Sequence, residues 1–336
     1  MSTGIIQLRA EMARQHSDAL QSLEEARAQA PEIAQALRKR GRLVLLGMGG
    51  SHWINRAVCS YYRDAGLDAT AHVVSEYMRS PLPNDPAMLV TSQSGRSGEV
   101  LRLIARGQVS PVAFGLTLEE DSPLAKALPS LIGTGGPELA YAATRSQLIT
   151  LAQHAAILEA LGQDISDIEA ILRVGPKQHS SPEAVERLER APVAVMIARG
   201  QAAQGVMDAA ALCLMETARM PVFGLEAGQF RHGPFEMIEP DSAIVMLRGA
   251  GPNSDDLATL ALECLSYGMC PIIFDCSGRG PVDGAITLPL RTQSGLALAF
   301  ESLPAVQELI VTASSLRLPD AGLPRRSTKV ASAEVA

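Results

Sequence analysis

A cluster of hydroxyl side chains lies between two apolar segments in the first third of the chain. The segment 92–97 is Ser-Gln-Ser-Gly-Arg-Ser; it follows the apolar run 87–91 and precedes the amphipathic run 100–104. If these runs are a strand and a helix, the backbone N–H groups of the helix N-terminus and the serine hydroxyls can bind a phosphate. Gly95 would let the backbone approach the anion closely. The same residues also suit an ordinary helix cap, and this segment alone leaves both interpretations open.

A glycine-rich turn forms a second candidate anion site. The segment Gly47-Met48-Gly49-Gly50-Ser51 follows the apolar run 43–46 and ends in a hydroxyl. It lacks the G-x-G-x-x-G spacing of dinucleotide-binding loops, and no suitably placed acid follows the next predicted strand. The turn therefore favours a small phosphate ligand over NAD, and we expect no redox cofactor.

Two residues of the second half have side chains that suit proton transfer. Glu216 ends an apolar helical run, and shielding by Leu212, Leu214 and Met215 would raise the pKa of its carboxyl group, as proton transfer at carbon requires. His232 lies on a predicted tight turn, and its near-neutral titration suits ring opening or leaving-group protonation. Each residue alone is better explained by a structural or surface role. Their combination with the serine segment favours a catalytic site.

An alternation of strands and helices must position these residues. Hydrophobic side chains make up 47% of the 336 residues, enough for two well-buried cores. A helix is predicted from residue 5 to 40, with Pro31-Glu32 as a first turn and Gly41 as a stop. Strands are predicted at 43–46, 71–74, 88–91, 112–116, 128–132, 193–197, 222–225, 243–247, 271–274 and 285–288. This pattern predicts two α/β domains, each with a doubly wound, flavodoxin-like and mainly parallel sheet that binds ligands at the carboxyl ends of its strands.

The boundary between these domains is predicted at residues 175–182, a segment rich in Gly, Pro and Ser. Ser181-Pro182-Glu183 is predicted to cap and begin a new helix. The expected organisation is an N-terminal helical segment at 1–40, a first domain at 41–174 and a second domain at 183–330. Weak sequence parallels between the two halves indicate that one domain is duplicated.

Charge and cysteine content exclude several classes of partner. The net charge of −7 argues against nucleic acid or an anionic membrane. The five cysteines lack metal-ligand spacing and neighbour apolar residues, so we predict buried free thiols in a reducing compartment and no metal. The sequence shows neither a signal-peptide core nor a run that could span a bilayer, and a cytoplasmic location is expected. The remaining histidines are predicted to be structural or surface residues, with His52, beside Ser51, as the one to follow: His16, His52, His72, His154 and His179.

Over residues 40–330, these motifs are similar to those of the double sugar isomerase (SIS) domain family. Gly49-Gly50-Ser51 resembles the family's first-strand turn, and 92–97 resembles its sugar-phosphate loop. The stretch 138–145 is similar to Glu-x-x-x-Ala-Ser-Thr-Lys, and 227–234 is similar to Ala-Gly-Glu-Leu-Lys-His-Gly-Pro. Glu216 precedes His232 by 16 residues (232 − 216), which is the spacing of the family's catalytic pair. The tail 324–329 resembles Pro-Arg-Asn-Leu-Ala-Lys; without this resemblance, Lys329 would be interpreted as a solvated tail residue.

The resemblance implies two tandem SIS domains and a phosphosugar isomerase that needs no metal or redox cofactor. Glu216 would move a proton between C1 and C2, His232 would open the sugar ring, and Lys329 would pair with the open-chain carbonyl or form an imine with it. The residues that would hold the sugar 6-phosphate or line the sugar are Gly49, Gly50, Ser51, Ser92, Gln93, Ser94, Ser97, Ala142 and Ala143. The family's histidine commonly reaches the site of the neighbouring subunit, so a homodimer with a shared active site is expected.

Departures from the family pattern leave the reaction open. No glutaminase domain precedes the predicted pair and Ser2 stands where a cysteine would, which favours conversion of glucosamine 6-phosphate to fructose 6-phosphate and ammonia over synthesis. Cys213 and Met215 stand where the family's aminosugar-phosphate synthases have two lysines. In this respect the segment resembles fructosamine-6-phosphate deglycases, which are the alternative enzyme. A non-catalytic sugar-phosphate-binding regulator is the alternative from another class. The retained Glu216, His232 and Lys329 speak against it, because a sensor needs no proton shuttle.

Overall fold

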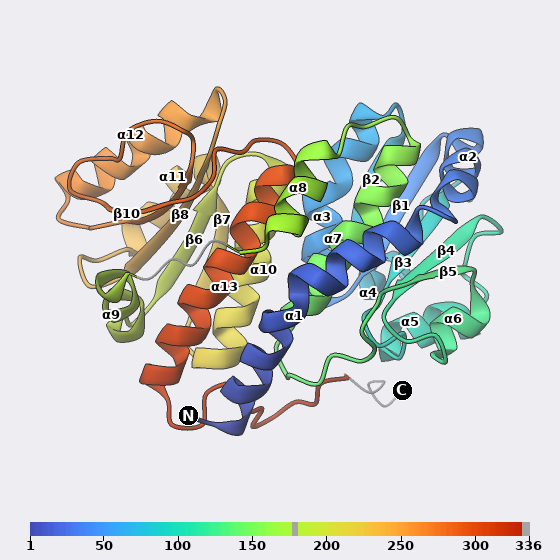
Figure 1. Ribbon diagram of the computed structural model, residues 1–336, viewed down its shortest axis with the longest axis horizontal. Coiled ribbons are helices and arrows are strands. Elements are labelled where there is room, and N and C mark those ends of the chain that lie inside the picture. The colour runs from blue at the N-terminus through green and yellow to red at the C-terminus, as the bar shows by residue number, and fades with distance from the viewer. Residues whose placement is uncertain (177–180, 331–336) are drawn as a thin grey trace. The chain divides into compact units, whose positions relative to one another are not determined.

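The computed structural model describes residues 1–176 and 181–330 and has an α/β fold with two parallel five-stranded sheets. The chain divides into two compact units. We call residues 10–175 with the segment from Pro324 onward the N-terminal unit, and residues 1–9 with 176–323 the C-terminal unit. Each unit contains one sheet with helices on both of its faces (Figure 1).

The sheet of the N-terminal unit has the strand order β2-β1-β3-β4-β5. One face is covered by the short helices that follow β2, β3 and β4, which pack on a cluster of Val44, Leu46, Met88 and Val90. The helices before and after β1 and the long helix after β5 contact the sheet as well. The elements are α1 (Thr3–Ala26, whose first residues belong to the other unit), α2 (Ala30–Arg40), β1 (Arg42–Gly47), α3 (Gly49–Asp64), β2 (Asp68–Val73), α4 (Val74–Tyr77), β3 (Ala87–Thr91), α5 (Gly98–Ala105), β4 (Ala113–Thr117), α6 (Pro123–Ala127), β5 (Ser130–Ile132), α7 (Arg145–Ala160) and α8 (Ser166–Val174).

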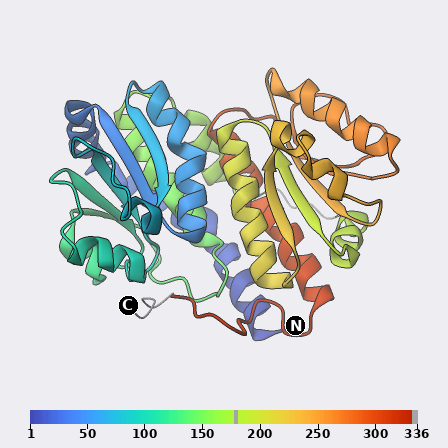
Figure 2. The same cartoon turned by 180° about the vertical axis from the view of Figure 1, so that it is seen from behind.

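The sheet of the C-terminal unit has the order β10-β9-β8-β6-β7, which is the same topology when its strands are numbered from the first. Helices α11 and α12 pack on one face, and α10 and α13 lie on the other (Figure 2). The elements are α9 (Pro182–Arg190), β6 (Ala194–Ala198), α10 (Gln201–Ala218), β7 (Val222–Glu226), α11 (Ala227–Arg231), a 3-10 helix at Pro234–Met237, β8 (Ala243–Gly249), α12 (Asn253–Ser266), β9 (Ile272–Cys276), β10 (Ile286–Pro289) and α13 (Ala297–Arg317).

The ten predicted strands are confirmed, and the largest difference is at β2, which begins at Asp68. The helical segment predicted over 5–40 forms two helices, α1 and α2, with a turn between them, and Pro31 and Glu32 lie in the first turn of α2 as predicted. In that turn the N–H groups of Ala28 and Gln29 donate to carbonyls three residues earlier, at 3.3 and 3.1 Å. Gly41 ends α2 as predicted, with a left-handed backbone (φ +74°) and an N–H that donates to Leu37.

The predicted linker at 175–182 lies partly outside the described residues. At its end, Ser181 caps α9 as predicted, because its hydroxyl accepts a hydrogen bond from the N–H of Ala184 at 3.1 Å. All five cysteines are free thiols; four are buried and Cys270 is half-buried. In the described part of the chain, every helix is too short or too polar to cross a membrane.

Candidate functional site

The serine segment and the glycine turn follow neighbouring strands of the N-terminal sheet. β1 pairs with β3, so both segments lie at the same carboxyl edge. The chain leaves β1 toward α3 and leaves β3 toward α5, whose apolar side chains pack on the face opposite α3. Ligands of open α/β sheets bind at such a topological switch point. The fold therefore brings the two predicted phosphate-binding segments to one edge.

The hydroxyls of the serine segment turn inward. Ser92 and Ser94 are buried, and Ser92 Oγ lies 3.1 Å from Ser97 Oγ. Ser97 is the residue before α5, yet its side chain makes no capping hydrogen bond to that helix. Ser97 therefore does not cap α5 with its side chain, and the first N–H groups of α5 are left to another acceptor. Gln93 is half-buried, and its main-chain carbonyl accepts from the N–H of Leu118 at 2.9 Å.

The glycine turn packs against the segment before α7. A Cβ atom at Gly50 would lie 3.6 Å from the Cβ of Ala143 and 3.0 Å from Nε2 of Gln147. Ser51, in the first turn of α3, is half-buried and Gly49 is exposed, whereas Ala142 is fully buried and Ala143 half-buried. Among the predicted sugar-lining residues, Ala143 thus comes close to the glycine turn, and Ala142 belongs to the core.

Lys329 of the C-terminal tail binds a buried carboxylate of the same unit. Its Nζ donates to Glu138 Oε2 at 2.9 Å, and Glu138 is 3% exposed. The carboxylate also accepts from Thr144 N (3.0 Å), Ser146 N (3.1 Å) and Ser146 Oγ (2.7 Å), so it caps α7 from a distance. A second contact joins the hydroxyls of Tyr141 and Ser327. The tail is therefore fixed to the segment 138–144.

The charge of this carboxylate depends on the tail. Burial by itself raises the pKa of Glu138, but the Lys329 ammonium and the Ser146 hydroxyl outweigh it and lower the pKa below its ordinary value. Glu138 is accordingly ionised at neutral pH. The sequence alone does not reveal this pair, because 191 residues separate its members.

Arg145, the last residue of the segment 138–145, has a structural role. Its side chain is completely buried; Nε donates to Glu11 at 2.6 Å and Nη1 to Asp18 at 3.0 Å. Its guanidinium also donates to the carbonyls of Thr134 and Gly136. Arg145 is therefore a structural residue, and its four hydrogen bonds go to α1 and to the loop that precedes α7.

A buried hydrogen-bond chain behind the switch point was missed by the sequence reasoning. Asn55 Oδ1 accepts from Thr91 Oγ1 at 2.9 Å and lies 3.1 Å from His154 Nε2, while His154 Nδ1 lies 2.8 Å from the hydroxyl of Tyr62. Burial lowers the pKa of His154 to about 3, so the ring is neutral at pH 7. The chain links α3 and α7 to the last residue of β3. The available signal was Asn55 itself, a polar residue between the apolar Ile54 and Ala57.

Glu216 and His232 belong to the C-terminal unit. Glu216 lies half-buried in the last turn of α10, beside the buried Cys213, and has polar contacts. His232 directly follows α11 and is exposed; its N–H donates to the carbonyl of Gln229 at 3.1 Å. Gly233 has φ +115°, a conformation that favours glycine and fixes the turn after the histidine. The structure thus divides the predicted site residues into two sets, one in each unit.

The histidine beside the glycine turn is held neutral. His52 on α3 is half-buried, and burial, with a smaller contribution from Arg56, lowers its pKa to about 4. His179 lies outside the described residues. Within the described ranges, His, Cys, Asp and Glu side chains form no group of three that could hold a metal ion.

Comparison with known proteins finds sequence similarity to glutamine–fructose-6-phosphate aminotransferases. The glutamine–fructose-6-phosphate aminotransferase (isomerizing) of Pyrobaculum aerophilum is 25% identical over 335 residues, covering 91% of this chain and 54% of that protein. The enzyme of the same name from Synechocystis sp. is 25% identical over 279 residues, covering 71% of this chain and 43% of that protein. The chain thus spans about half the length of the curated relatives it matches. No protein-family model matches it.

Solved structures share the fold over nearly the whole chain. The C-terminal domain of glucosamine-fructose-6-phosphate aminotransferase from Francisella tularensis has a TM-score of 0.80 at 15% identity, covering 93% of this chain and 96% of that one. Tagatose-6-phosphate ketose/aldose isomerase from Escherichia coli has a TM-score of 0.78 at 18% identity, covering 95% of each chain. Glucosamine-6-phosphate deaminase from Thermotoga maritima has a TM-score of 0.72 at 17% identity, covering 94% and 99%. The chain is thus similar in sequence to these aminotransferases over most of its length, and it shares the fold of solved phosphosugar isomerase structures over nearly all of it.

Proposed function

We propose that the protein is an aminosugar-6-phosphate deaminase that converts glucosamine 6-phosphate to fructose 6-phosphate and ammonia. The observation that carries the sugar-phosphate part is the serine segment, whose hydroxyls and uncapped α5 N-terminus form donors for a dianion at a switch point. The aminosugar part is supported by relatives named for aminosugar chemistry, in both the sequence and the structural comparisons. The activity, the homodimer and the residue roles are all parts of this proposal.

The proposed reaction needs only proton transfers and one water molecule. After His232 opens the ring, Glu216 removes the proton from C2 and returns it to C1, while the carbonyl oxygen on C1 is protonated to a hydroxyl. The electron pair of the broken C2–H bond first forms a C1=C2 double bond as the carbonyl oxygen takes a proton. When this π pair then takes a proton at C1, the nitrogen lone pair forms the C2=N double bond and the nitrogen gives up one proton. Water adds to this imine, and ammonia leaves to give the C2 ketone of fructose 6-phosphate. Two general acid–base groups and a phosphate handle suffice for these steps.

The contact between Lys329 and Glu138 favours one of the two roles expected for the lysine. An ammonium that donates to a carboxylate at 2.9 Å has no lone pair with which to attack a carbonyl carbon. It can still donate to the oxygen of the open-chain carbonyl as negative charge develops there. We therefore assign Lys329 to stabilising this oxygen and Glu138 to positioning the lysine.

Ammonia release from glucosamine 6-phosphate, with fructose 6-phosphate measured by a coupled reaction, tests the proposal directly. Equal amounts of both products are expected. Glu216→Gln should reduce turnover at least about a hundredfold, the usual contribution of a general base, while substrate still stabilises the protein against heat. Glu189→Gln, on α9, is the matched control and should leave turnover unchanged.

Binding without turnover would refute the deaminase. If a fructosamine 6-phosphate adduct released its amine under the same conditions, the deglycase alternative would take its place. If neither compound turned over while both stabilised the protein, the non-catalytic regulator would be the correct class. Turnover that persists in Glu216→Gln would instead refute the role of the glutamate.

A further inference from the structure

The C-terminal unit contains a cavity of about 170 Å³ at the carboxyl edge of its sheet. Arg199 follows β6 directly, Asp256, Thr259 and Leu260 lie on α12 after β8, and Arg231 ends α11 after β7. β6 and β8 are neighbours, and their chain connections lead to helices on opposite faces of the sheet. The cavity therefore occupies the switch point of this sheet, the position at which the other sheet has its serine segment.

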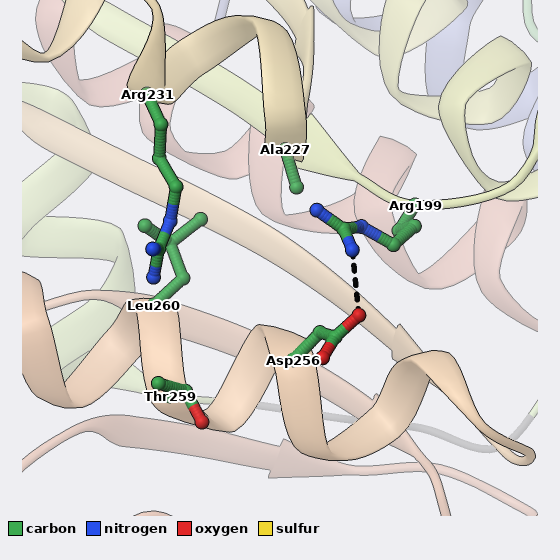
Figure 3. A pocket seen from close by; sticks show the side chains of 6 residues that line it. All are labelled: Arg199, Ala227, Arg231, Asp256, Thr259 and Leu260. Atoms are coloured by element: carbon green, nitrogen blue, oxygen red, sulfur yellow. Dashed lines mark hydrogen bonds and ion pairs between the residues drawn. The ribbon is translucent and has the colours of Figure 1, made fainter.

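Two guanidinium groups point into this cavity from different elements. Figure 3 shows Arg199 and Arg231 on two sides of the space, with α12 as its floor. Arg199 Nη1 donates to Asp256 at 2.5 Å, and Arg231 Nη2 lies 2.7 Å from Glu263. Arg199 Nε is buried and makes no hydrogen bond within the described chain; a carboxylate oxygen of Glu226 lies 3.4 Å away. This buried donor at the cavity is thus ion-paired with Glu226 but makes no hydrogen bond to it.

We propose that this cavity is a second oxyanion site, which takes the phosphoryl group of a small phosphorylated metabolite. Two arginine forks on separate elements match the several oxygens of one phosphoryl group. The volume limits the ligand, because a cavity of about 150 Å³ holds a benzene molecule. A phosphoryl group with a short carbon chain fits this space, and a nucleotide does not.

An anion that enters the cavity must compete with neighbouring carboxylates for the two arginines. Glu226, Asp256 and Glu263 already face the two arginines, so a ligand must replace part of these contacts. A phosphoryl dianion carries twice the charge of a single carboxylate and can bridge both guanidinium groups. Glu226 is also engaged elsewhere, because its carboxylate accepts from the N–H groups of Gly228 and Gln229 at the start of α11.

A bound anion would link the loop after β6 to the last residue of α11. His232 is the next residue along the chain, so occupancy of the cavity would restrain the turn that carries it. This consequence for catalysis rests on the proposed function, in which His232 opens the ring. The oxyanion site itself does not depend on that reaction.

Amide chemical shifts of the full chain, titrated with inorganic phosphate, separate the two sites. Shifts at 92–97 report on the serine segment, and shifts at 227–231 and 256–260 report on the cavity. Arg199→Gln should weaken phosphate binding at the cavity about tenfold, since a hydrogen bond to a charged group contributes about 1.5–3 kcal/mol and 1.4 kcal/mol is tenfold. The serine segment should respond as before. Arg231→Gln gives an independent second test of the cavity.

Control variants show whether each change in chemical shift reports phosphate binding at the intended site. Arg279→Gln removes an arginine that pairs with Asp255 on the same helix but does not line the cavity, and both responses should be unchanged. Ser92→Ala should weaken only the response at 92–97. A phosphate response at 92–97 alone would refute the second site and leave the proposed function intact. A response at the cavity alone would support the second site and refute phosphate binding by the serine segment, on which the proposed function rests. Succinate shifting the cavity residues as strongly as phosphate would overturn the phosphoryl assignment.

Discussion

Replacing Lys329 with methionine tests the energetic importance of the contact between the tail and Glu138. The substitution keeps an unbranched side chain, one atom shorter, and removes its charge, which leaves a 3%-exposed carboxylate without a counter-charge. Breaking a buried ion pair costs about 3–5 kcal/mol. Here Glu138 keeps three hydrogen bonds from Thr144 and Ser146, and the Lys329 side chain is 24% exposed. Because these bonds still solvate part of the charge, we expect a loss of about 2 kcal/mol, below that range.

The pH dependence of this loss identifies its cause. In the native chain the pKa of Glu138 is lowered, so its stabilising contribution is present at neutral pH and is lost as pH falls through the folded-state pKa. In Lys329→Met the burial of the carboxyl group is offset only by the hydrogen bonds from Thr144 and Ser146, and the folded-state pKa should rise. Protonation then relieves the unpaired charge. The stability difference between the two proteins should therefore shrink as pH falls from 7 toward 5.

Urea unfolding of the full chain, followed at pH 7 and pH 5, measures both quantities. Lys126→Met is the matched control, because that lysine is 67% exposed and lies 4.0 Å from the exposed Asp121; it should cost under about 0.5 kcal/mol. In a Glu138→Gln background, Lys329→Met should have little further effect. The reasoning fails if Lys329→Met is as stable as the native chain at pH 7, or if its deficit is the same in the Glu138→Gln background.

Three further predictions concern the framework of the N-terminal unit. The pKa of His154 falls from about 6.5 in the unfolded chain to about 3 in the folded one, so the unfolded state takes up a proton first as pH decreases. The free energy of unfolding, measured in urea, should therefore fall by about 2 kcal/mol between pH 7 and 5 from this residue alone. In His154→Gln this pH-dependent loss should be absent. Gly95→Ala should cost about 3 kcal/mol and weaken phosphate binding, because φ is +60° and a Cβ would lie 2.2 Å from Ser122 Oγ; Gly107→Ala, with φ +64° and open space, should cost about 1 kcal/mol. Arg145→Met should cost about 3–5 kcal/mol, whereas Arg14→Met, which removes a 44%-exposed arginine beside the same two acids, should cost under about 1 kcal/mol.

Local sequence signals were sufficient to predict the strands of both sheets. Most strands are apolar runs bounded by polar or turn-forming residues, as a parallel sheet covered on both faces requires, whereas the edge strand β2 (Asp68–Val73) contains Asp, Thr and His and is only partly buried. The end of α1 was not located from the sequence, because Arg27, Ala28 and Gln29 are all good helix formers. Their turn is closed by hydrogen bonds to carbonyls three residues back, and Pro31, in the first turn of α2, was the only local signal of a new helix.

Some contacts of the candidate site could not be predicted from the spacing of residues in the sequence. The serine segment and the glycine turn were recognisable because their donors lie within six residues and follow apolar strands. The partner of Lys329 was not recognisable, since Glu138 is 191 residues away and only the tertiary fold joins them. The buried role of Arg145 was not recognisable either, since its partners Glu11 and Asp18 lie on α1, 134 and 127 residues earlier in the chain.

The two sheets repeat one topology but have different chemistry at their switch points. After β1 and β3 the chain offers Gly50, Ser51, Ser92 and Ser94, which are neutral donors beside a helix N-terminus. After β6 the corresponding position is Arg199, whose charge is balanced by Asp256 and Glu226. Neutral donors can bind a dianion without displacing any acid, whereas an arginine paired with carboxylates binds only by exchange. A duplicated framework therefore does not imply a duplicated site: we expect the serine segment to bind phosphate more tightly, and the arginine cavity to respond only to higher concentrations of the same anion.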